Sequence, residues 1–280
     1  MINILDKAAV RELFFELLIA DREEDVIGAL EAAGLWEHKA SWRLLGDRED
    51  NYATIGAQAV IPEAALAEKI TNAIDAILMR RCREEGIDPK GPDAPASVRK
   101  AVARYFEVNP DASYSGTLES WDQPKILEVA RATTSIALTG DRRKQVNRRR
   151  NYPSVSILDR GEGQAPETQP RTLLSRGNSL KKDVAFTQGK FAMGGTAALR
   201  FCGQQKLQLI LSRRAPVLAK ADGESSDWGF TVVRRDYHDG DSMTAYRYLA
   251  PLGADERPGS GDILRFPAAS LPIGPRYNKP

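Results

Sequence analysis

Apolar positions near the N-terminus recur at intervals of three and four residues. This spacing predicts an amphipathic helix whose apolar face is formed by Val10, Leu13, Phe14, Leu17 and Leu18. A second helix is predicted from Asp21, where Glu24 would complete a capping box, to Gly34. The longest helical pattern begins at Pro62, a residue suited to the first helical turn, and ends at Gly86.

Shorter apolar runs in the second half of the chain predict strands. They cover residues 155–159, 206–212, 229–235, 244–249 and, more briefly, 262–266. The turn dipeptide Asp239-Gly240 is predicted to connect the last two long strands, and a separate hairpin is predicted around Gly46-Asp47.

Residues 88–150 are predicted to form a helical insertion, with a loop rich in Pro and Gly followed by helical stretches at 97–108 and 125–139. Residues 1–45 are predicted to form an N-terminal helical cap. Helices followed by a run of strands are typical of an α+β sandwich, here with one antiparallel or mixed sheet covered by helices. The sequence contains no internal repeat.

The composition is that of an ordinary globular protein: 280 residues, 42% hydrophobic and 28% charged, with a mean hydropathy of −0.41. These values exclude a collagen-like or wholly disordered chain. Cys82 and Cys202 lie far apart, which argues against a disulfide framework or a structural zinc site. No apolar run approaches the ~18 residues of a membrane helix, and no signal peptide is apparent, so we expect a cytoplasmic protein without membrane contact.

The net charge is only +2, but the positive charge is unevenly distributed. Residues 141–150, DRRKQVNRRR, carry six Arg or Lys side chains in ten positions. A basic run from Arg142 to Arg150 suits contact with nucleic-acid phosphates. A solvated loop ahead of a strand explains the run equally well.

Three segments carry candidate chemistry, and the first lies on the predicted helix at 62–86. Offsets of four and three place Glu68, Asn72 and Asp75 on one face, opposite Leu66, Ile70, Ile74 and Ile77. A carboxylate one turn from a carboxamide suits a general base beside an oxygen ligand for Mg²⁺. A solvated helix face is the alternative explanation of this stripe taken alone.

The second and third segments are rich in glycine. Asp159, Gly161 and Gly163 follow a predicted strand, where the acid can accept a hydrogen bond from an exocyclic amine and the glycines permit close approach. Residues 189–196, GKFAMGGT, lead into a predicted helix whose free amides suit an anion. A β-turn and a tight loop-to-helix turn are the respective alternatives. The absence of GxxxxGK[ST] excludes a P-loop.

In this order and spacing, the three segments resemble the GHKL, or Bergerat-fold, ATPase superfamily. The pattern ExxxNxxDA at 68–76 resembles its N box, DxGxG at 159–163 its first glycine box, and GKFAMGG at 189–195 its second. The match is closest to the heat-shock chaperone, MutL and MORC branches. The resemblance implies a two-layer α/β sandwich, with a mixed or antiparallel sheet covered on one face by helices, and Mg²⁺-dependent ATP binding and hydrolysis.

The resemblance also implies a role for each matched residue. Glu68 would be the general base for the attacking water, and Asn72 would hold Mg²⁺. Asp159 would accept the adenine amino group beside the two glycines that shape the pocket, and Asp75 would support the site.

Residues 164–188 would form a lid over ATP. The phosphate-binding residues would be Gly189, Lys190, Phe191, Gly194, Gly195 and Thr196. Two lid lysines are candidates to reach a phosphate, with a solvated pair as the alternative: Lys181 and Lys182.

The ATP-binding domain is predicted to occupy residues 46–280. The open Pro-rich end suggests that the sequence is a piece of a longer protein. In that protein, ATP binding would control homodimerisation. Members of this family usually carry a threonine on a late strand that reaches the adenine pocket. In this sequence only Thr231 and Thr244 could take its place. Two alternatives stay open: a non-hydrolysing ATP sensor, and a DNA-associated ATPase that uses the basic run at 141–150.

Overall fold

The computed structural model describes residues 6–47, 51, 61–107, 109, 111–139, 153–175, 181–189, 194–236, 244–252 and 261–272. Several predictions fall outside these residues and stay predictions: the second strand of the hairpin after Asp47, the basic run Arg142–Arg150, the Asp239-Gly240 turn, Lys190 and Phe191.

The helices form largely where periodicity predicts them. They are α1 (Lys7–Ile19), α2 (Glu23–Ala32), α4 (Pro62–Glu84), α5 (Val98–Phe106), α6 (Gln123–Thr133), α7 (Gly194–Ala197) and α8 (Pro216–Asp222). Pro62 occupies the first turn of α4, and Gly86 follows its end with a positive φ of 74°, as glycine allows. The predicted capping box is wrong, because Arg22 is the N-cap of α2 and makes no side-chain capping bond.

All described strand pairs are antiparallel. The strands are β1 (Trp42–Leu44), β2 (Thr134–Thr139), β3 (Ser154–Asp159), β4 (Gln208–Ser212), β5 (Trp228–Asp236), β6 (Ala245–Leu249) and β7 (Leu264–Phe266). A five-stranded sheet has the order β1-β6-β5-β4, with β7 also paired to β5, and β2 pairs with β3 in a sheet of two strands. The α+β class is confirmed, but the described strands form two sheets, where one was predicted.

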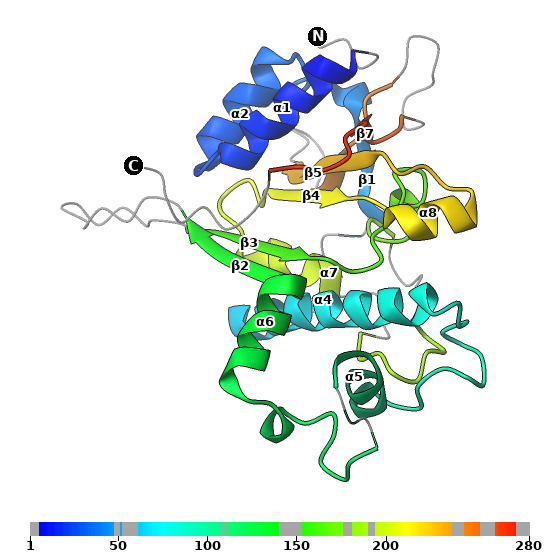
Figure 1. The fold of residues 1–280 in the computed structure, drawn as a ribbon. Helices are drawn as coiled ribbons and strands as arrows, with labels where there is room; N and C mark the ends of the chain where they lie inside the picture. The colour runs from blue at the N-terminus through cyan, green and yellow to red at the C-terminus, as the bar shows by residue number, and fades with distance from the viewer. Residues whose placement is uncertain are drawn as a thin grey trace, which may run out of the picture.

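The main core lies between α1–α2 and the five-stranded sheet. Phe14 of α1 packs against Phe230 and Phe266, with ring centroids 5.3 and 5.5 Å away. On the opposite face of the sheet, Val233 and Tyr248 join a second cluster. Figure 1 shows α1–α2 on one side of this sheet, with α7 and α4 on the other. The helices therefore flank this sheet on both sides, whereas the sequence predicted cover on one face.

One local prediction is corrected, and two others are made more precise. Residues 125–139 are not one helix, because α6 ends at Thr133 and β2 follows directly. The strand before Gly46-Asp47 pairs on one side with distant β6, through Trp42 and Leu249, and the hairpin partner predicted after Asp47 lies outside the described residues. On α4, the apolar face opposite Asp75 is only partly covered, because Ile77 is buried whereas Leu66 and Ile74 are 40% and 41% exposed.

None of the described helices combines the length and the apolar character that crossing a membrane requires.

Candidate functional site

Asp75 is the buried centre of the candidate site. Although it is ionisable, its exposed fraction is 1%, because it lies on a covered face of α4 beside Leu78, one turn further along the helix. Its Oδ1 accepts a hydrogen bond from the Gln188 N–H at 3.0 Å, and its Oδ2 accepts one from the Gly189 N–H at 2.8 Å. A buried carboxylate needs such partners. A solvated face therefore does not explain this part of the predicted stripe.

Gly189 brings the third segment into contact with α4. A Cβ atom at this position would lie 2.6 Å from Oδ1 of Asn72 and 3.1 Å from Oδ2 of Asp75. Only glycine allows its backbone amide to approach these two side chains so closely. The first residue of the predicted phosphate-binding segment is thus packed directly on the predicted magnesium-binding face.

The Asp159–Gly163 loop reaches α4 one residue further along. The N–H of Glu162 donates to the carbonyl oxygen of Ala76 at 3.0 Å, and a Cβ on Gly161 would lie 2.4 Å from that of Ala76. Gly163 has a φ of +60°, and a Cβ there would meet the Arg213 carbonyl oxygen at 1.7 Å. Both glycines serve close packing of this loop onto its neighbours.

Asp159 as a whole is exposed to solvent. Protein groups around its carboxylate nevertheless remove part of its hydration and raise its pKa, against the opposing effects of the Gly161 N–H and the Lys181 ammonium. Its Oδ1 accepts the Gly161 N–H at 2.8 Å. Among the described residues, no donor contacts Oδ2, so the carboxylate keeps an acceptor for a ligand donor.

Lys181 also reaches the inward face of α4. Its Nζ lies 3.2 Å from Oδ2 of Asp75 and 3.3 Å from Oδ1 of Asn72. Its neighbour Lys182 is exposed. Of the two lysines predicted as phosphate ligands, the structure therefore brings Lys181 alone to the site.

A partly buried ion-pair network anchors the Asp159–Gly163 loop, and it was not predicted from the sequence. Oε2 of Glu162 accepts hydrogen bonds from Arg83 of α4 and from Arg214, each at 3.0 Å. Burial opposes the charge of Arg214, but the carboxylates of Asp222 and Glu162 raise its pKa overall. The arginines in the last turn of α4 were the available signal in the sequence.

The remaining predicted residues are less tightly placed. Glu68 is exposed, and no hydrogen bond within the described residues orients it. Thr196 is 6% exposed and lies in α7, the short helix that begins at Gly194. Thr231 is buried in β5, and its hydroxyl donates to the Leu249 carbonyl oxygen at 2.7 Å.

The described parts of the predicted lid at 164–188 carry buried anchors. Leu174 is fully buried beside Val233 and Tyr248 of the sheet. Val184 and Phe186 are buried in a cluster with Leu78 of α4 and with α5. These anchors fix the chain on either side of residues 176–180, and the lid role itself stays a prediction.

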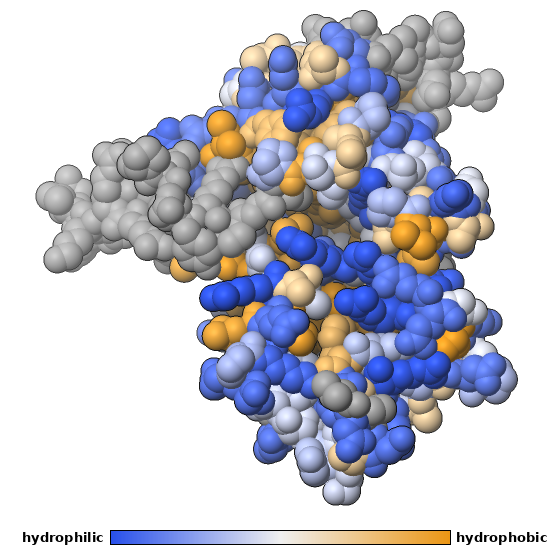
Figure 2. Space-filling model, viewed as in Figure 1, coloured by the Kyte–Doolittle hydropathy of each residue, from blue (hydrophilic) through white to orange (hydrophobic). Residues whose placement is uncertain are grey.

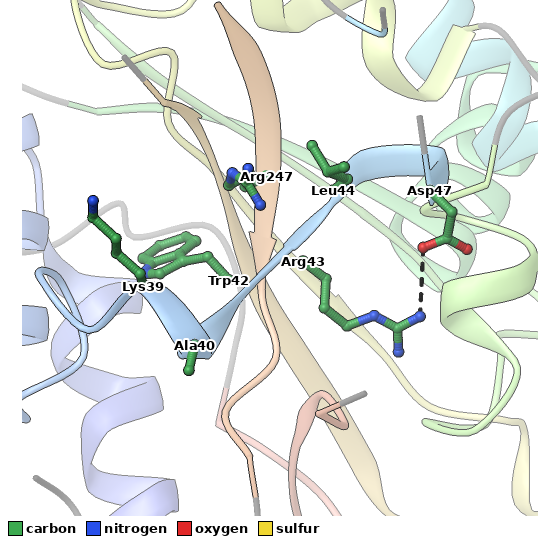
Figure 3. Close-up of a pocket in the computed structure, with 7 residues that line it drawn as sticks. All are labelled: Lys39, Ala40, Trp42, Arg43, Leu44, Asp47 and Arg247. Atoms are coloured by element: carbon green, nitrogen blue, oxygen red, sulfur yellow. Dashed lines mark hydrogen bonds and ion pairs between the residues drawn. The ribbon is translucent and has the colours of Figure 1, made fainter. Parts of the chain in front are cut away.

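A recess of about 600 Å³ lies elsewhere, along the edge strand β1 (Figure 3). Its lining includes Trp42, Arg43 and Arg247, and Arg43 pairs with Asp47 at 3.5 Å. It contains none of the predicted site residues. The view in Figure 2 is largely hydrophilic over the lower half of the molecule, with separate hydrophobic spots instead of one continuous apolar patch.

Comparisons with protein-family models, with curated proteins and with solved structures find no match for this chain. Within the described residues, no group of three or more His, Cys, Asp or Glu side chains could hold a metal ion. A cation at α4 would therefore depend on the Asn72 amide oxygen, one carboxylate and the oxygens of a ligand.

Proposed function

We propose that this chain is a GHKL-type module that binds ATP with Mg²⁺ and hydrolyses it. One observation carries the proposal: both glycine segments contact a single stretch of α4, Asn72–Ala76. Segments that were separate motifs in the sequence are thus neighbours around one buried carboxylate. The α+β fold supports the proposal at a coarser level, and the Bergerat topology is part of what we propose.

The two ends of the nucleotide would meet different chemistry. Asp159 offers a carboxylate oxygen to the adenine amino group, in a loop held against Ala76. The phosphates would lie toward Gly189 and the start of α7, where backbone amides and the Lys181 ammonium provide positive potential. This arrangement suits a reaction that depends mainly on positioning and on charge stabilisation.

The side chains at α4 would suit Mg²⁺, because two of their oxygens already face one positive charge, the Lys181 ammonium. Oδ1 of Asn72 and Oδ2 of Asp75 converge on one ammonium nitrogen. Mg²⁺ typically keeps several waters and uses one or two protein oxygens together with substrate phosphates, so no larger acidic cluster is needed. When bound, the ion would neutralise charge on the phosphates.

A non-hydrolysing ATP sensor is the second candidate. The observation that favours it is the exposure of Glu68, which no hydrogen bond orients within the described residues. Hydrolysis requires this carboxylate to reach a water beside the terminal phosphate, whereas binding does not. ATP-gated homodimerisation and DNA contact through Arg142–Arg150 remain proposals from the sequence.

Replacing the proposed base separates the two candidates. Glu68→Ala should lower the ATP turnover number about 10²–10⁴-fold, the usual contribution of a general base, with ATP affinity retained. Glu63→Ala, on the exposed first turn of the same helix, is the matched control and should behave as wild type. Turnover by wild type no faster than by Glu68→Ala, with both proteins binding ATP, would leave the sensor as the better description.

A further inference from the structure

The ammonium of Lys181 occupies the position expected for a bound cation. It lies between a carboxamide oxygen of Asn72 and a carboxylate oxygen of Asp75, at 3.3 and 3.2 Å. The Lys181 side chain is 19% exposed and that of Asp75 is 1% exposed. An almost fully buried carboxylate is strongly destabilised when its cationic partner is removed, so this ammonium has a defined electrostatic role.

The segment that carries Lys181 is held to the body of the protein. Val184 and Phe186 are fully or almost fully buried against α4 and α5. The Thr187 hydroxyl lies 3.2 Å from the Val184 carbonyl oxygen, closing the turn that precedes Gly189. On the surface of the same segment, Lys90 pairs with Asp183 at 3.3 Å. The ammonium can therefore move by rotation of its own side chain while the segment stays docked.

We propose that Lys181 is an internal cation that competes with the divalent metal for the oxygens of Asn72 and Asp75. This inference rests on the proposed function and adds its regulation. Two cations cannot share this pair of oxygens, because their repulsion is strong where water is largely excluded. In the ligand-free protein the Lys181 ammonium forms an ion pair with the Asp75 carboxylate. When Mg²⁺ arrives with a nucleotide, the ammonium gives up these oxygens and turns to the phosphates, whose negative charge compensates it.

The competition has a consequence for metal binding without nucleotide. Free Mg²⁺ must displace the ammonium, which then loses its ion pair with Asp75 and gains no new anion in exchange. A metal accompanied by phosphates supplies such an anion. The site therefore discriminates against metal alone and couples metal binding to nucleotide binding.

Metal binding by itself tests the competition. Mn²⁺, a cation with the same preference for carboxylate, carbonyl and water ligands, can be titrated without nucleotide and followed by electron paramagnetic resonance. Lys181→Met should bind Mn²⁺ about tenfold or more tightly than wild type, because the competing charge is gone. Lys90→Met removes the other lysine that fastens the segment, and it should bind Mn²⁺ as wild type does. Equal or weaker Mn²⁺ binding by Lys181→Met would overturn the proposal.

A second measurement uses the wild-type protein and avoids any loss of folding. In the absence of nucleotide, amine-reactive labelling followed by mass spectrometry should find the Lys181 amine protected at low Mg²⁺ and several-fold more reactive at Mg²⁺ concentrations high enough to displace it, with Lys90 unchanged. A Lys181 reactivity independent of Mg²⁺ contradicts the competition. ATP binding measured on the same samples distinguishes a failure of the proposed function from a failure of the cation competition. Tighter Mn²⁺ binding by Lys181→Met without ATP binding rejects the proposed function, whereas ATP binding with unchanged Mn²⁺ affinity rejects the competition.

Discussion

Asp75 connects three distant parts of the chain through one carboxylate. It accepts the N–H groups of Gln188 and Gly189, and it pairs with Lys181. Ala76, the next residue on α4, accepts the N–H of Glu162. A change at this point of the helix is therefore expected to disturb both glycine segments together.

Lys69 gives a prediction about pH. Burial lowers its pKa from 10.5 to about 8, although Cys202 and Glu68 act in the opposite direction. Between about pH 8 and 10.5 the unfolded chain then binds more protons at this lysine than the folded protein does. Its contribution to the free energy of unfolding must therefore rise with pH across this window, by on the order of 2 kcal/mol.

The contribution can be isolated by comparing Lys69→Met with its parent. Both proteins should carry Cys202→Ser, because burial raises the pKa of that thiol and its titration has the opposite sign. Urea unfolding at several pH values should find the parent gaining stability relative to Lys69→Met as pH increases. A difference that stays constant from about pH 8 to 10.5 would show that Lys69 is not desolvated.

At the scale of elements, the Asp159–Gly163 loop is clamped between α4 and the turn that precedes α8. Glu162 carries this clamp, because its 12% exposed side chain pairs with Arg83 and with Arg214. Glu162→Gln should lower the free energy of unfolding by about 2–3 kcal/mol, since Arg83 and Arg214 each lose the Glu162 carboxylate, although Arg214 keeps its ion pair with Asp222. Chemical denaturation measures the change.

A matched control is available on the surface. Glu167 pairs with Arg265, and its side chain is 43% exposed. Glu167→Gln should cost less than about 1 kcal/mol, because exposed ion pairs contribute little. If the two substitutions cost the same small amount, the clamp does not stabilise the loop.

The helices could be predicted from the sequence more fully than the pairing of the strands. Periodicity located α1 and α4 because an amphipathic pattern is local. It failed after Thr133, where β-branched residues favour a strand and the partner of β2 is β3. The pairing of β1 with β6 joins residues about 200 positions apart, and no local pattern encodes such a contact.

The candidate site could be predicted in outline only. The order of the motifs anticipated that Asn72, Asp75 and Gly189 belong together. It did not anticipate the partners of Glu162, because ion pairs between distant segments depend on the tertiary fold. Lys181 was a candidate because it lies in the predicted lid, ahead of the second glycine segment. Its contact with Asp75 of α4 was not predicted from the sequence.

At the scale of the whole molecule, the N-terminal helices share a core with the sheet. Phe14 packs on strands β5 and β7 through Phe230 and Phe266. In Figure 1, α4 lies on the opposite side of the five-stranded sheet from α1–α2. The sheet thus joins the N-terminal helices to the part of the molecule that carries the candidate site.

The most direct test of the account is equilibrium binding of ATP and GTP, by isothermal titration calorimetry with Mg²⁺ present, to wild type and to Asp159→Asn. In this variant the amide oxygen can still accept the Gly161 N–H, but a donor replaces the oxygen that would meet the adenine amino group. Wild type should bind ATP more tightly than GTP, and Asp159→Asn should lose about tenfold or more in ATP affinity. No ATP binding by wild type, or equal ATP affinity in the two proteins, would contradict the account.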